Sequence, residues 1–159
     1  MQRVFETIKK EVEKHPDVEV VYPVHLSPRV QQMAKQVFAD EPRVHLIAPL
    51  DVVDFHNLAA HSYLIMTDSG GVQEEAPSLN KPVLVLRDET ERPEGVTAGT
   101  LRLVGTDPKK VGQAIEELLD DTAIYQKMTQ APNPYGDGRA AERIVSICKK
   151  YLGSLVTNN

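Results

Sequence analysis

Five short runs rich in apolar and β-branched residues recur along the chain, with polar or helix-forming segments between them. The runs are VEVVYPV (18–24), VHLIAP (44–49), YLIMTD (63–68), PVLVL (82–86) and TLRLVG (100–105). Strands of a parallel sheet are covered by helices on both faces, so they read as apolar runs of this kind. The sequence therefore predicts an α/β fold, with a doubly wound, mostly parallel, Rossmann-like sheet and helices on both faces.

Helical periodicity fills most of the intervening segments. Apolar residues recur at helical spacing over residues 2–14, 28–38, 51–61, 107–119, 121–130 and about 138–152. A short helix follows the glycines near residue 70, and Pro77 ends, kinks or restarts it because proline lacks the amide of a helix interior. Residues 87–99 are predicted to form the one long irregular loop. The chain opens on a helix, whereas a doubly wound domain usually opens on a central strand.

Composition narrows the class of protein further. The length of 159 residues fits one domain, and 18 Lys and Arg against 23 Asp and Glu give a net charge of −5, which argues against nucleic-acid binding. Cys148 is the single cysteine, so neither an intrachain disulfide nor a cysteine zinc cluster is expected, and a cytoplasmic protein fits best. Residues 1–16 lack the apolar core of a signal peptide, and no apolar run approaches the roughly 18 residues that span a bilayer. We expect no membrane partner.

The stretch TDSGGVQEEAP (67–77) holds the strongest functional signal. At Ser69, Gly70 and Gly71 a strand turns directly into a helix, and glycine lets the backbone come close to a ligand. The first amides of a helix lack partners and carry about half a positive charge, so this turn can bind a phosphate. The alternative is a tight turn capped by the serine. The motif is neither a Walker A loop nor a full dinucleotide fingerprint.

Glu74 and Glu75 continue the same helix. At about 1.5 Å per residue, Glu75 lies about 6 Å along the axis from Gly71, which is roughly the distance from a diphosphate to the ribose of a nucleotide. A carboxylate at this place can accept hydrogen bonds from both ribose hydroxyls. Only one of the two adjacent acids can face the ligand, and compensation of the helix dipole is the alternative role.

Three further residues draw attention through their positions. Arg92, in RDETERPEG (87–95), either pairs with a diphosphate in a bidentate way or belongs to ion pairs within a surface loop. His25, in YPVHLSP, follows a strand and either contributes to a site or caps a turn. Periodicity places Phe55 in the core. Since no metal-binding spacing and no nucleophile elbow occur, the residues alone predict a nucleotide-binding α/β domain without a particular reaction.

Four segments closely resemble one family: YPVHLSP, TDSGGVQEEAPSLNKPVLVLRDETERPEGVTAGT, LVGTD and NPYGDGRAAERI. They are similar to the C-terminal half of the bacterial non-hydrolysing UDP-N-acetylglucosamine 2-epimerases, and the similarity runs through nearly all of the chain. The resemblance implies that residues 1–159 form a single UDP-binding lobe of a GT-B-like fold. Family members interconvert UDP-N-acetylglucosamine and UDP-N-acetylmannosamine by elimination and re-addition of UDP, for cell-wall and other surface polysaccharides. They need no NAD and no obligatory metal, so no cofactor is expected.

The resemblance assigns roles to residues of this chain by position. Ser69, Gly70 and Gly71 match the diphosphate-binding turn, and Glu75 matches the acid that holds the ribose hydroxyls. Arg92 matches an arginine of the UDP site, which favours the functional interpretation of that residue.

Three more residues receive roles in the same way. Phe55 matches the aromatic residue that stacks on uracil, and this role replaces its assignment to the core. Leu50 lies where the backbone contacts the base, and His25 matches a histidine of a second, allosteric UDP-N-acetylglucosamine site.

Parts of the family pattern are absent from this chain. The family's acid/base carboxylates lie in an N-terminal lobe, and a Gly-His-Arg-Arg-Glu-like segment, which ends the first strand of the C-terminal lobe, would lie just before Met1. We therefore expect the first strand to be missing, the catalytic residues to lie elsewhere, and the chain alone not to epimerise. We also expect the helix near 138–152 to pack against the other lobe, and the open strand position to favour a homo-oligomer, a dimer. A non-catalytic UDP-sugar-binding module and a lobe of a GT-B-type glycosyltransferase remain alternatives.

Overall fold

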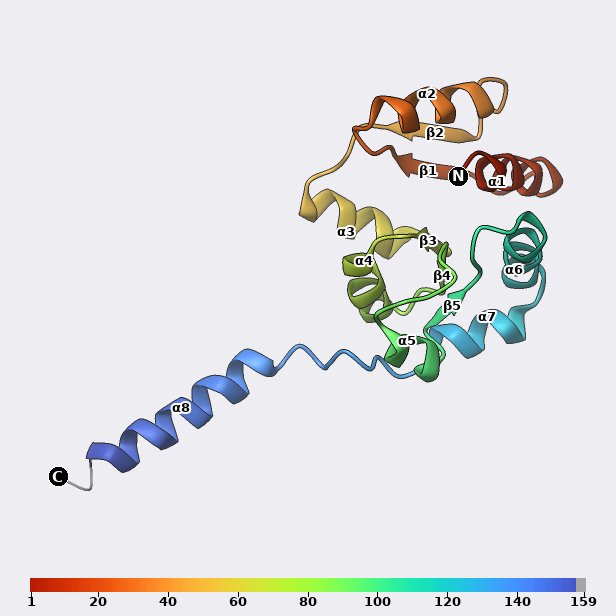
Figure 1. Cartoon of the computed structure of the whole chain (residues 1–159). Coiled ribbons are helices and arrows are strands. Elements are labelled where there is room, and N and C mark those ends of the chain that lie inside the picture. Colours follow the sequence, from red (N-terminus) through yellow and green to blue (C-terminus); the bar gives the residue numbers. More distant parts are fainter. Residues whose placement is uncertain (157–159) are drawn as a thin grey trace.

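The structure, a computed structural model, describes residues 1–156, and the five predicted strands are all present there, joined by helices (Figure 1). In chain order the elements are α1 (Gln2–Lys14), β1 (Val20–Pro23), α2 (Pro28–Val37), β2 (Val44–Ile47), α3 (Val52–His61), β3 (Ile65–Thr67), α4 (Gly70–Glu75), the 3₁₀ turn η1 (Ala76–Leu79), β4 (Val83–Val85), α5 (Pro93–Ala98), β5 (Leu101–Leu103), α6 (Pro108–Asp120), α7 (Thr122–Thr129) and α8 (Ala140–Val156). This alternation confirms the predicted α/β class.

The predicted loop over residues 87–99 contains a helix. α5 occupies Pro93–Ala98, with Pro93 in its first turn and Gly99 ending it at a φ of +86°. Proline at the start of a helix and glycine just past its end are both favoured by their backbone conformations. The prediction of an irregular loop over the whole stretch is therefore wrong at its C-terminal end. Pro77 lies in η1, which continues α4 in a tighter form, as a proline that ends or restarts a helix would.

The strands form two hydrogen-bonded sheets, both parallel. β1 pairs with β2, with Val20 opposite Val44, and β3, β4 and β5 pair with Ile65 opposite Val83 and Val83 opposite Leu101. A doubly wound sheet often has the strand order 3-2-1-4-5-6, in which the first strand of the chain lies in the centre. The observed pairs β2-β1 and β3-β4-β5 reproduce this order without its central strand. The sheet therefore divides at the place that a missing first strand would fill.

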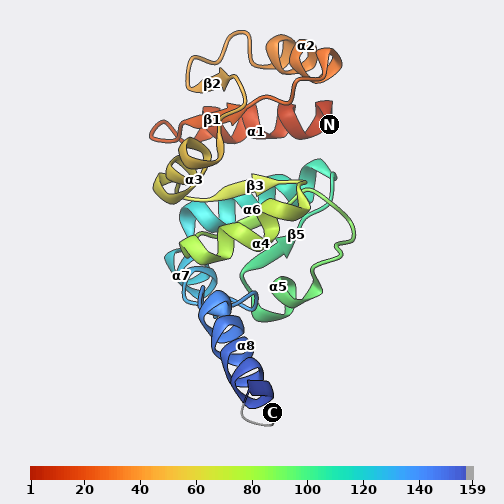
Figure 2. The same cartoon turned by 90° about the vertical axis from the view of Figure 1, so that its left-hand side faces the viewer.

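Alternate residues of β4 pack on opposite faces of the three-stranded sheet, as the period of a strand requires. Leu84 joins a core cluster with residues of α1, α6 and α7, whereas Val83 and Val85 pack with residues of α4 and η1. All three side chains are fully buried. Figure 2 shows α4 in front of this sheet and α6 behind it. Helices thus cover both of its faces, as the apolar runs predicted.

A third core cluster lies between the two-stranded sheet and the helices α1 and α2. Phe5 of α1 is central to it, with its ring centroid 5.5 Å from that of Tyr22 and 5.4 Å from that of Phe38. α1 also packs against α6, beside the three-stranded sheet. The first helix therefore links the helical layers of the two sheets.

α8 extends away from the rest of the molecule in both views (Figures 1 and 2). Its side chains Ile144, Val145 and Ile147 are 60%, 50% and 67% exposed. They contribute to none of the three core clusters that the structure describes. Within residues 1–156, no helix has both the length and the apolar character needed to cross a membrane.

Candidate functional site

The candidate site begins where β3 leads into α4, at the carboxyl edge of the three-stranded sheet, which is where ligands of such sheets bind. β3 ends at Thr67, and Ser69 stands immediately before α4. The Ser69 amide donates a hydrogen bond to Thr67 Oγ1 over 3.0 Å, while the Ser69 side chain makes no capping hydrogen bond. The alternative of a turn capped by the serine hydroxyl is therefore not what the structure shows.

Gly70 leaves room for an arginine that arrives from another part of the chain. A β-carbon at position 70 would lie 3.0 Å from Glu91 Oε1 and 3.4 Å from Arg92 Cζ. Gly70 and Gly71 both have ordinary, negative φ angles. Glycine is therefore needed here because it has no side chain and leaves room, and not because of its backbone conformation. The structure thus places the Arg92 guanidinium beside the turn after β3, so two parts that the family resemblance assigned to the UDP site lie next to each other.

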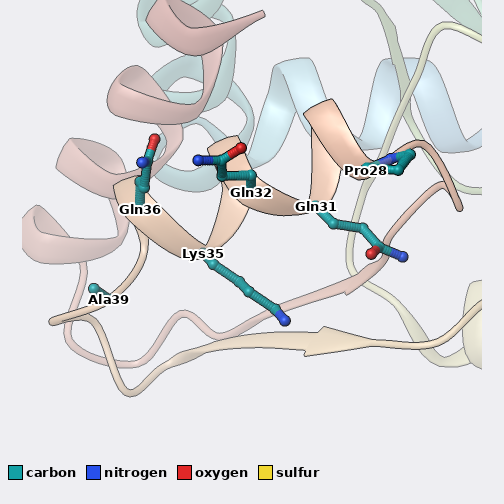
Figure 3. A pocket seen from close by; sticks show the side chains of 6 residues that line it. All are labelled: Pro28, Gln31, Gln32, Lys35, Gln36 and Ala39. Carbon is teal, nitrogen blue, oxygen red and sulfur yellow. The ribbon is translucent and has the colours of Figure 1, made fainter.

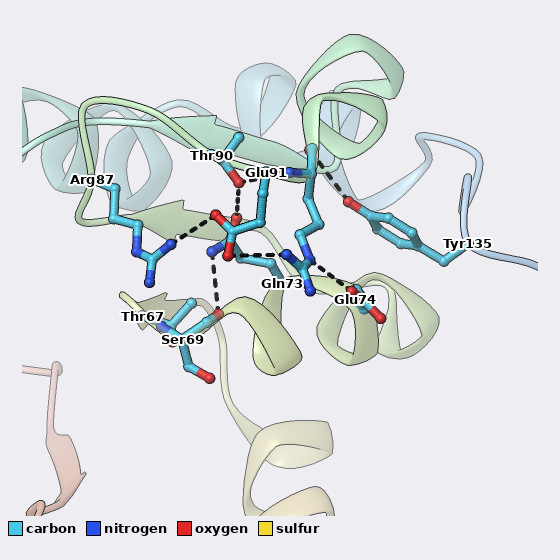
Figure 4. Close-up of polar contacts among 9 residues, drawn as sticks. Thr67, Ser69, Gln73, Glu74, Arg87, Thr90, Glu91 and Tyr135 are labelled. Atoms are coloured by element: carbon cyan, nitrogen blue, oxygen red, sulfur yellow. Dashed lines mark hydrogen bonds and ion pairs between the residues drawn. The ribbon is translucent and has the colours of Figure 1, made fainter.

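Arg92 forms ion pairs with two carboxylates, those of Glu74 and Glu91, both of which are labelled in Figure 4. Its Nε donates to Glu74 Oε1 over 2.6 Å, and its Nη1 lies 3.0 Å from Glu91 Oε1. Glu91 also accepts a hydrogen bond from Arg87 over 2.9 Å. The hydrogen bond that Arg92 donates to Glu74 raises the pKa of Arg92, while the backbone amide of Glu91 itself, followed by the charge of Arg87, lowers the pKa of Glu91. The structure therefore shows the ion pairs within the surface loop that the sequence offered as the alternative role of Arg92. A guanidinium has five N–H donors, so Arg92 can still donate hydrogen bonds to a ligand.

The two adjacent glutamates of α4 face different partners. Glu74 pairs with Arg92, whereas Glu75 Oε2 lies 3.0 Å from Nε2 of His56 on α3. The Glu75 side chain is 53% exposed, so its carboxylate remains open to a ligand. The sequence predicted that the two acids diverge but gave no sign of either partner, because the partners lie 18 and 19 positions away.

Phe55 and Leu50 lie around the start of α3. Asp51, the N-cap of α3, accepts a backbone hydrogen bond of the first turn over 2.9 Å and so fixes the chain directly after Leu50. Phe55 is half-buried and belongs to none of the described core clusters, so its assignment to the core by periodicity is wrong. Periodicity marks an apolar stripe but does not show where packing ends. The Phe55 ring lies 6.0 Å from that of His56, the residue that contacts Glu75.

His25 makes its hydrogen bond within its own turn. The exposed imidazole accepts at Nδ1 from the amide of Ser27 over 3.1 Å. The structure therefore shows the turn-capping role that the sequence left open. It brings His25 into no described hydrogen bond with the turn at Ser69 or with Arg92, and a role in a second site stays a prediction.

Sequence reasoning missed a buried polar side chain behind the turn. Gln73 is 0% exposed, and its Nε2 donates to the carbonyl of Ser69 over 3.2 Å (Figure 4). Its Oε1 accepts a hydrogen bond from Thr90, on the connection that carries Arg92. A glutamine in a helix is ordinarily exposed, so nothing in the sequence separated it from a surface residue.

Elsewhere on the described surface, neither a hollow nor a cluster of metal-binding side chains adds to the predicted site. A shallow hollow lies along α2 (Figure 3), and none of the predicted site residues lines it. Across residues 1–156, no group of three or more His, Cys, Asp or Glu side chains is arranged to hold a metal ion. Of the predicted site residues, Ser69, Gly70, Gly71 and Arg92 lie together at the turn after β3.

The fold and this site define a doubly wound α/β protein with its polar groups at the carboxyl edge of a parallel sheet. The family model described as UDP-N-acetylglucosamine 2-epimerase matches residues 1–149. The chain belongs to the UDP-N-acetylglucosamine 2-epimerase family, whose members are isomerases.

Relatives support this assignment in sequence and in structure. The UDP-N-acetylglucosamine 2-epimerase of Bacillus subtilis is 61% identical over 145 residues, which are 91% of this chain and 38% of that protein. The S. aureus MnaA–UDP co-structure superposes with a TM-score of 0.90 at 53% identity, over 96% of this chain and 42% of that one. The Neisseria meningitidis UDP-GlcNAc 2-epimerase, solved with UDP-GlcNAc bound, gives 0.89 at 41% identity, over 94% and 41%. The chain thus spans about two fifths of the length of these relatives.

Proposed function

We propose that this chain is the UDP-binding part of an enzyme that interconverts UDP-N-acetylglucosamine and UDP-N-acetylmannosamine. The observation that carries the proposal is the Arg92 guanidinium beside Gly70, at the turn that follows β3. Membership of the epimerase family, and relatives solved with UDP or UDP-GlcNAc, support the ligand.

In this proposal each site residue binds one part of UDP. The hydroxyl of Ser69, the amides of Gly70 and Gly71 and the guanidinium of Arg92 face the diphosphate, whose charge strengthens their hydrogen bonds. The exposed carboxylate of Glu75 accepts hydrogen bonds from the ribose hydroxyls.

The base and a second sugar nucleotide occupy residues further from the turn. Phe55, half-buried at the start of α3, stacks on uracil, and the backbone at Leu50 contacts the edge of the base. His25 belongs to a separate site for a second UDP-sugar. Binding of that second UDP-sugar activates the whole enzyme.

The proposed reaction begins with loss of the C2 proton and cleavage of the C1–O bond, so that UDP leaves with the bonding electrons and 2-acetamidoglucal remains. UDP then adds back at C1 while a proton returns to the other face of C2. Positive groups placed around the leaving diphosphate stabilise the charge that develops on it, which is electrostatic catalysis. Arg92 and the turn at Ser69 supply this part, and carboxylates outside this chain move the proton.

α8 fits the same arrangement. Its exposed apolar residues, among them Ile144 and Ile147, would become buried if the helix packed against the remaining part of the whole protein. We place the products of the whole enzyme in the synthesis of surface polysaccharides.

Calorimetry with UDP tests the binding function on the chain as it is. The wild type should bind UDP, and Glu75→Ala should weaken binding about tenfold or more, because a charged hydrogen bond to the ribose is lost. Glu13→Ala, which removes an exposed carboxylate of α1, is the matched control and should bind like the wild type. If the Glu75 and Glu13 variants bind UDP with equal affinity, Glu75 does not contribute to UDP binding.

A turnover assay tests the division of labour. Incubated with UDP-N-acetylglucosamine, the purified chain should form neither UDP-N-acetylmannosamine nor free UDP. Detectable epimerisation would show that the proton-transfer groups lie within this chain.

A further inference from the structure

Gln73 is the most deeply buried polar side chain near the proposed diphosphate site. It is 0% exposed, and both ends of its amide are used: Nε2 donates to the Ser69 carbonyl over 3.2 Å, and Oε1 accepts from Thr90 Oγ1 over 2.6 Å. Buried polar groups are costly unless they are paired, so a side chain that satisfies both ends has little freedom to move. Gln73 therefore ties the turn before α4 to the connection between β4 and α5.

Thr90 connects Gln73 to the backbone of Arg92 through two hydrogen bonds. The Thr90 hydroxyl donates its proton to Gln73 and accepts a hydrogen bond from the Arg92 amide over 3.0 Å (Figure 4). On the other side of the same residue, the Arg92 carbonyl accepts from Tyr135 Oη over 3.5 Å. The backbone of Arg92 is thus held from both directions, although the residue lies in a connection before α5 begins.

This backbone position decides where the guanidinium can reach. Arg92 Cζ lies 3.4 Å from the place of a β-carbon on Gly70, so a small shift of the connection would carry the charge away from the turn. The bonds of the guanidinium itself, to Glu74 and Glu91, involve carboxylates that are 47% and 52% exposed. Exposed pairs of this kind are weak in water, whereas the Gln73 side chain at the centre of the relay is buried and its hydrogen bonds are partly shielded from water.

We infer that Gln73 and Thr90 are positioning residues: they form a partly buried hydrogen-bond relay from Ser69 to the Arg92 amide that presets Arg92 for a diphosphate. The inference rests on the proposed function, because it takes the diphosphate of UDP as the ligand. Holding a long side chain in its bound place before the ligand arrives reduces the entropy lost on binding. The relay acts only through Arg92 and makes no contact with the ligand of its own.

A double-mutant cycle tests the relay. The affinity for UDP is measured by calorimetry for the wild type, Thr90→Val, Arg92→Ala and the double variant. Valine has nearly the shape of threonine but no hydroxyl, and we expect Thr90→Val to weaken UDP binding about five- to tenfold. In the Arg92→Ala background the same change should alter affinity by less than about twofold, because the group that it positions is gone.

Two further variants distinguish a loss of Arg92 positioning from a general loss of stability. Thr90→Ser keeps the hydroxyl and should restore affinity to within about twofold of the wild type. Thr97→Val, the same substitution at an exposed place on α5, is the matched control and should leave both affinity and unfolding midpoint unchanged. If Thr90→Val does not fold, Thr90→Ala and Thr90→Ser are compared in the same cycle.

Each outcome has a separate meaning. If the wild type binds UDP but Thr90→Val binds as tightly, or weakens binding equally with and without Arg92, the relay is overturned while the proposed function stands. If the wild type does not bind UDP at all, the proposed function fails and the inference fails with it. A loss confined to chains that retain Arg92, with rescue by serine, supports the relay.

Discussion

At the scale of single residues, contacts between distant parts of the chain decide what the site residues do. Glu74 and Glu75 are neighbours in sequence, yet one pairs with Arg92 and the other with His56. The sequence predicted which residues matter at the turn but not their partners, because pairing depends on which connections meet in space. Gln73 shows the same limit, since its hydrogen bond from Thr90 joins residues 17 positions apart.

Gly70→Ala should weaken UDP binding about tenfold while leaving the fold stable. Its β-carbon would lie 3.0 Å from Glu91 Oε1 and 3.4 Å from Arg92 Cζ, so these flexible side chains would swing away from the turn. Calorimetry with UDP, together with a urea unfolding curve, checks both parts. Thr106→Ala, on an exposed loop, is the control. An alanine variant that binds UDP as the wild type does would show that the guanidinium does not need its place beside the turn.

His56→Ala should weaken UDP binding about two- to fivefold, because the Glu75 carboxylate loses the imidazole that lies 3.0 Å away and becomes less ordered. Combined with Glu75→Ala, the same change should add almost nothing. Titration of UDP into the four chains measures this coupling. Full additivity of the two losses would mean that His56 acts independently of Glu75.

At the scale of elements, local rules explain most of the structure and fail where only tertiary contacts decide. The strands, and the caps Asp51, Asp107 and Asp121, follow from signals that lie within a few residues of each other. The helix at Pro93–Ala98 was open to prediction, because its proline and the glycine after it form a recognisable pair. Periodicity could not show that Phe55 is only half-buried, since a helix can bury only part of its apolar stripe.

Gly95→Ala should destabilise α5 and its packing on β5 by about 1–3 kcal/mol. A β-carbon there would lie 2.5 Å from Leu101 Cδ1 and 2.6 Å from the hydroxyl oxygen of Tyr135. The Leu101 side chain is buried, so it cannot move away without disturbing the core around it. Urea unfolding followed by circular dichroism gives the free energy. Thr97→Ala, on the exposed side of the same helix, should cost less than about 0.5 kcal/mol. Equal stability of the two variants would contradict the close packing at this position.

At the scale of the whole molecule, the division into two sheets is the main departure from a complete doubly wound domain. β1 and β3 each have one edge that no described strand covers, and all residues of β3 are only half-buried, whereas all residues of β4 are buried. The pattern of apolar runs predicted the strands but not this division, because hydrogen bonding between strands is not visible in any single run. The helical opening, and the absence of the segment that ends the first strand in the family that the chain resembles, were the signs of it in the sequence.

The uncovered edges of β1 and β3, where the sheet divides, should make this chain associate with itself, since uncovered edges are templates for pairing. Light scattering over a range of concentrations should show a mass above 17.7 kDa that rises with concentration. Cysteine oxidation is excluded by repeating the measurement with Cys148→Ser. A strict monomer at every concentration would contradict the prediction.

The central claim is that the turn after β3 and Arg92 together bind the diphosphate of UDP. Titration of UDP into ¹⁵N-labelled chain, followed residue by residue by NMR, tests it most directly. We predict saturable shifts of the amides of Ser69, Gly70, Gly71 and Arg92, with smaller changes at Phe55. Absence of shifts at about 1 mM UDP, or shifts confined to the surfaces of α1 and α2, would contradict the account.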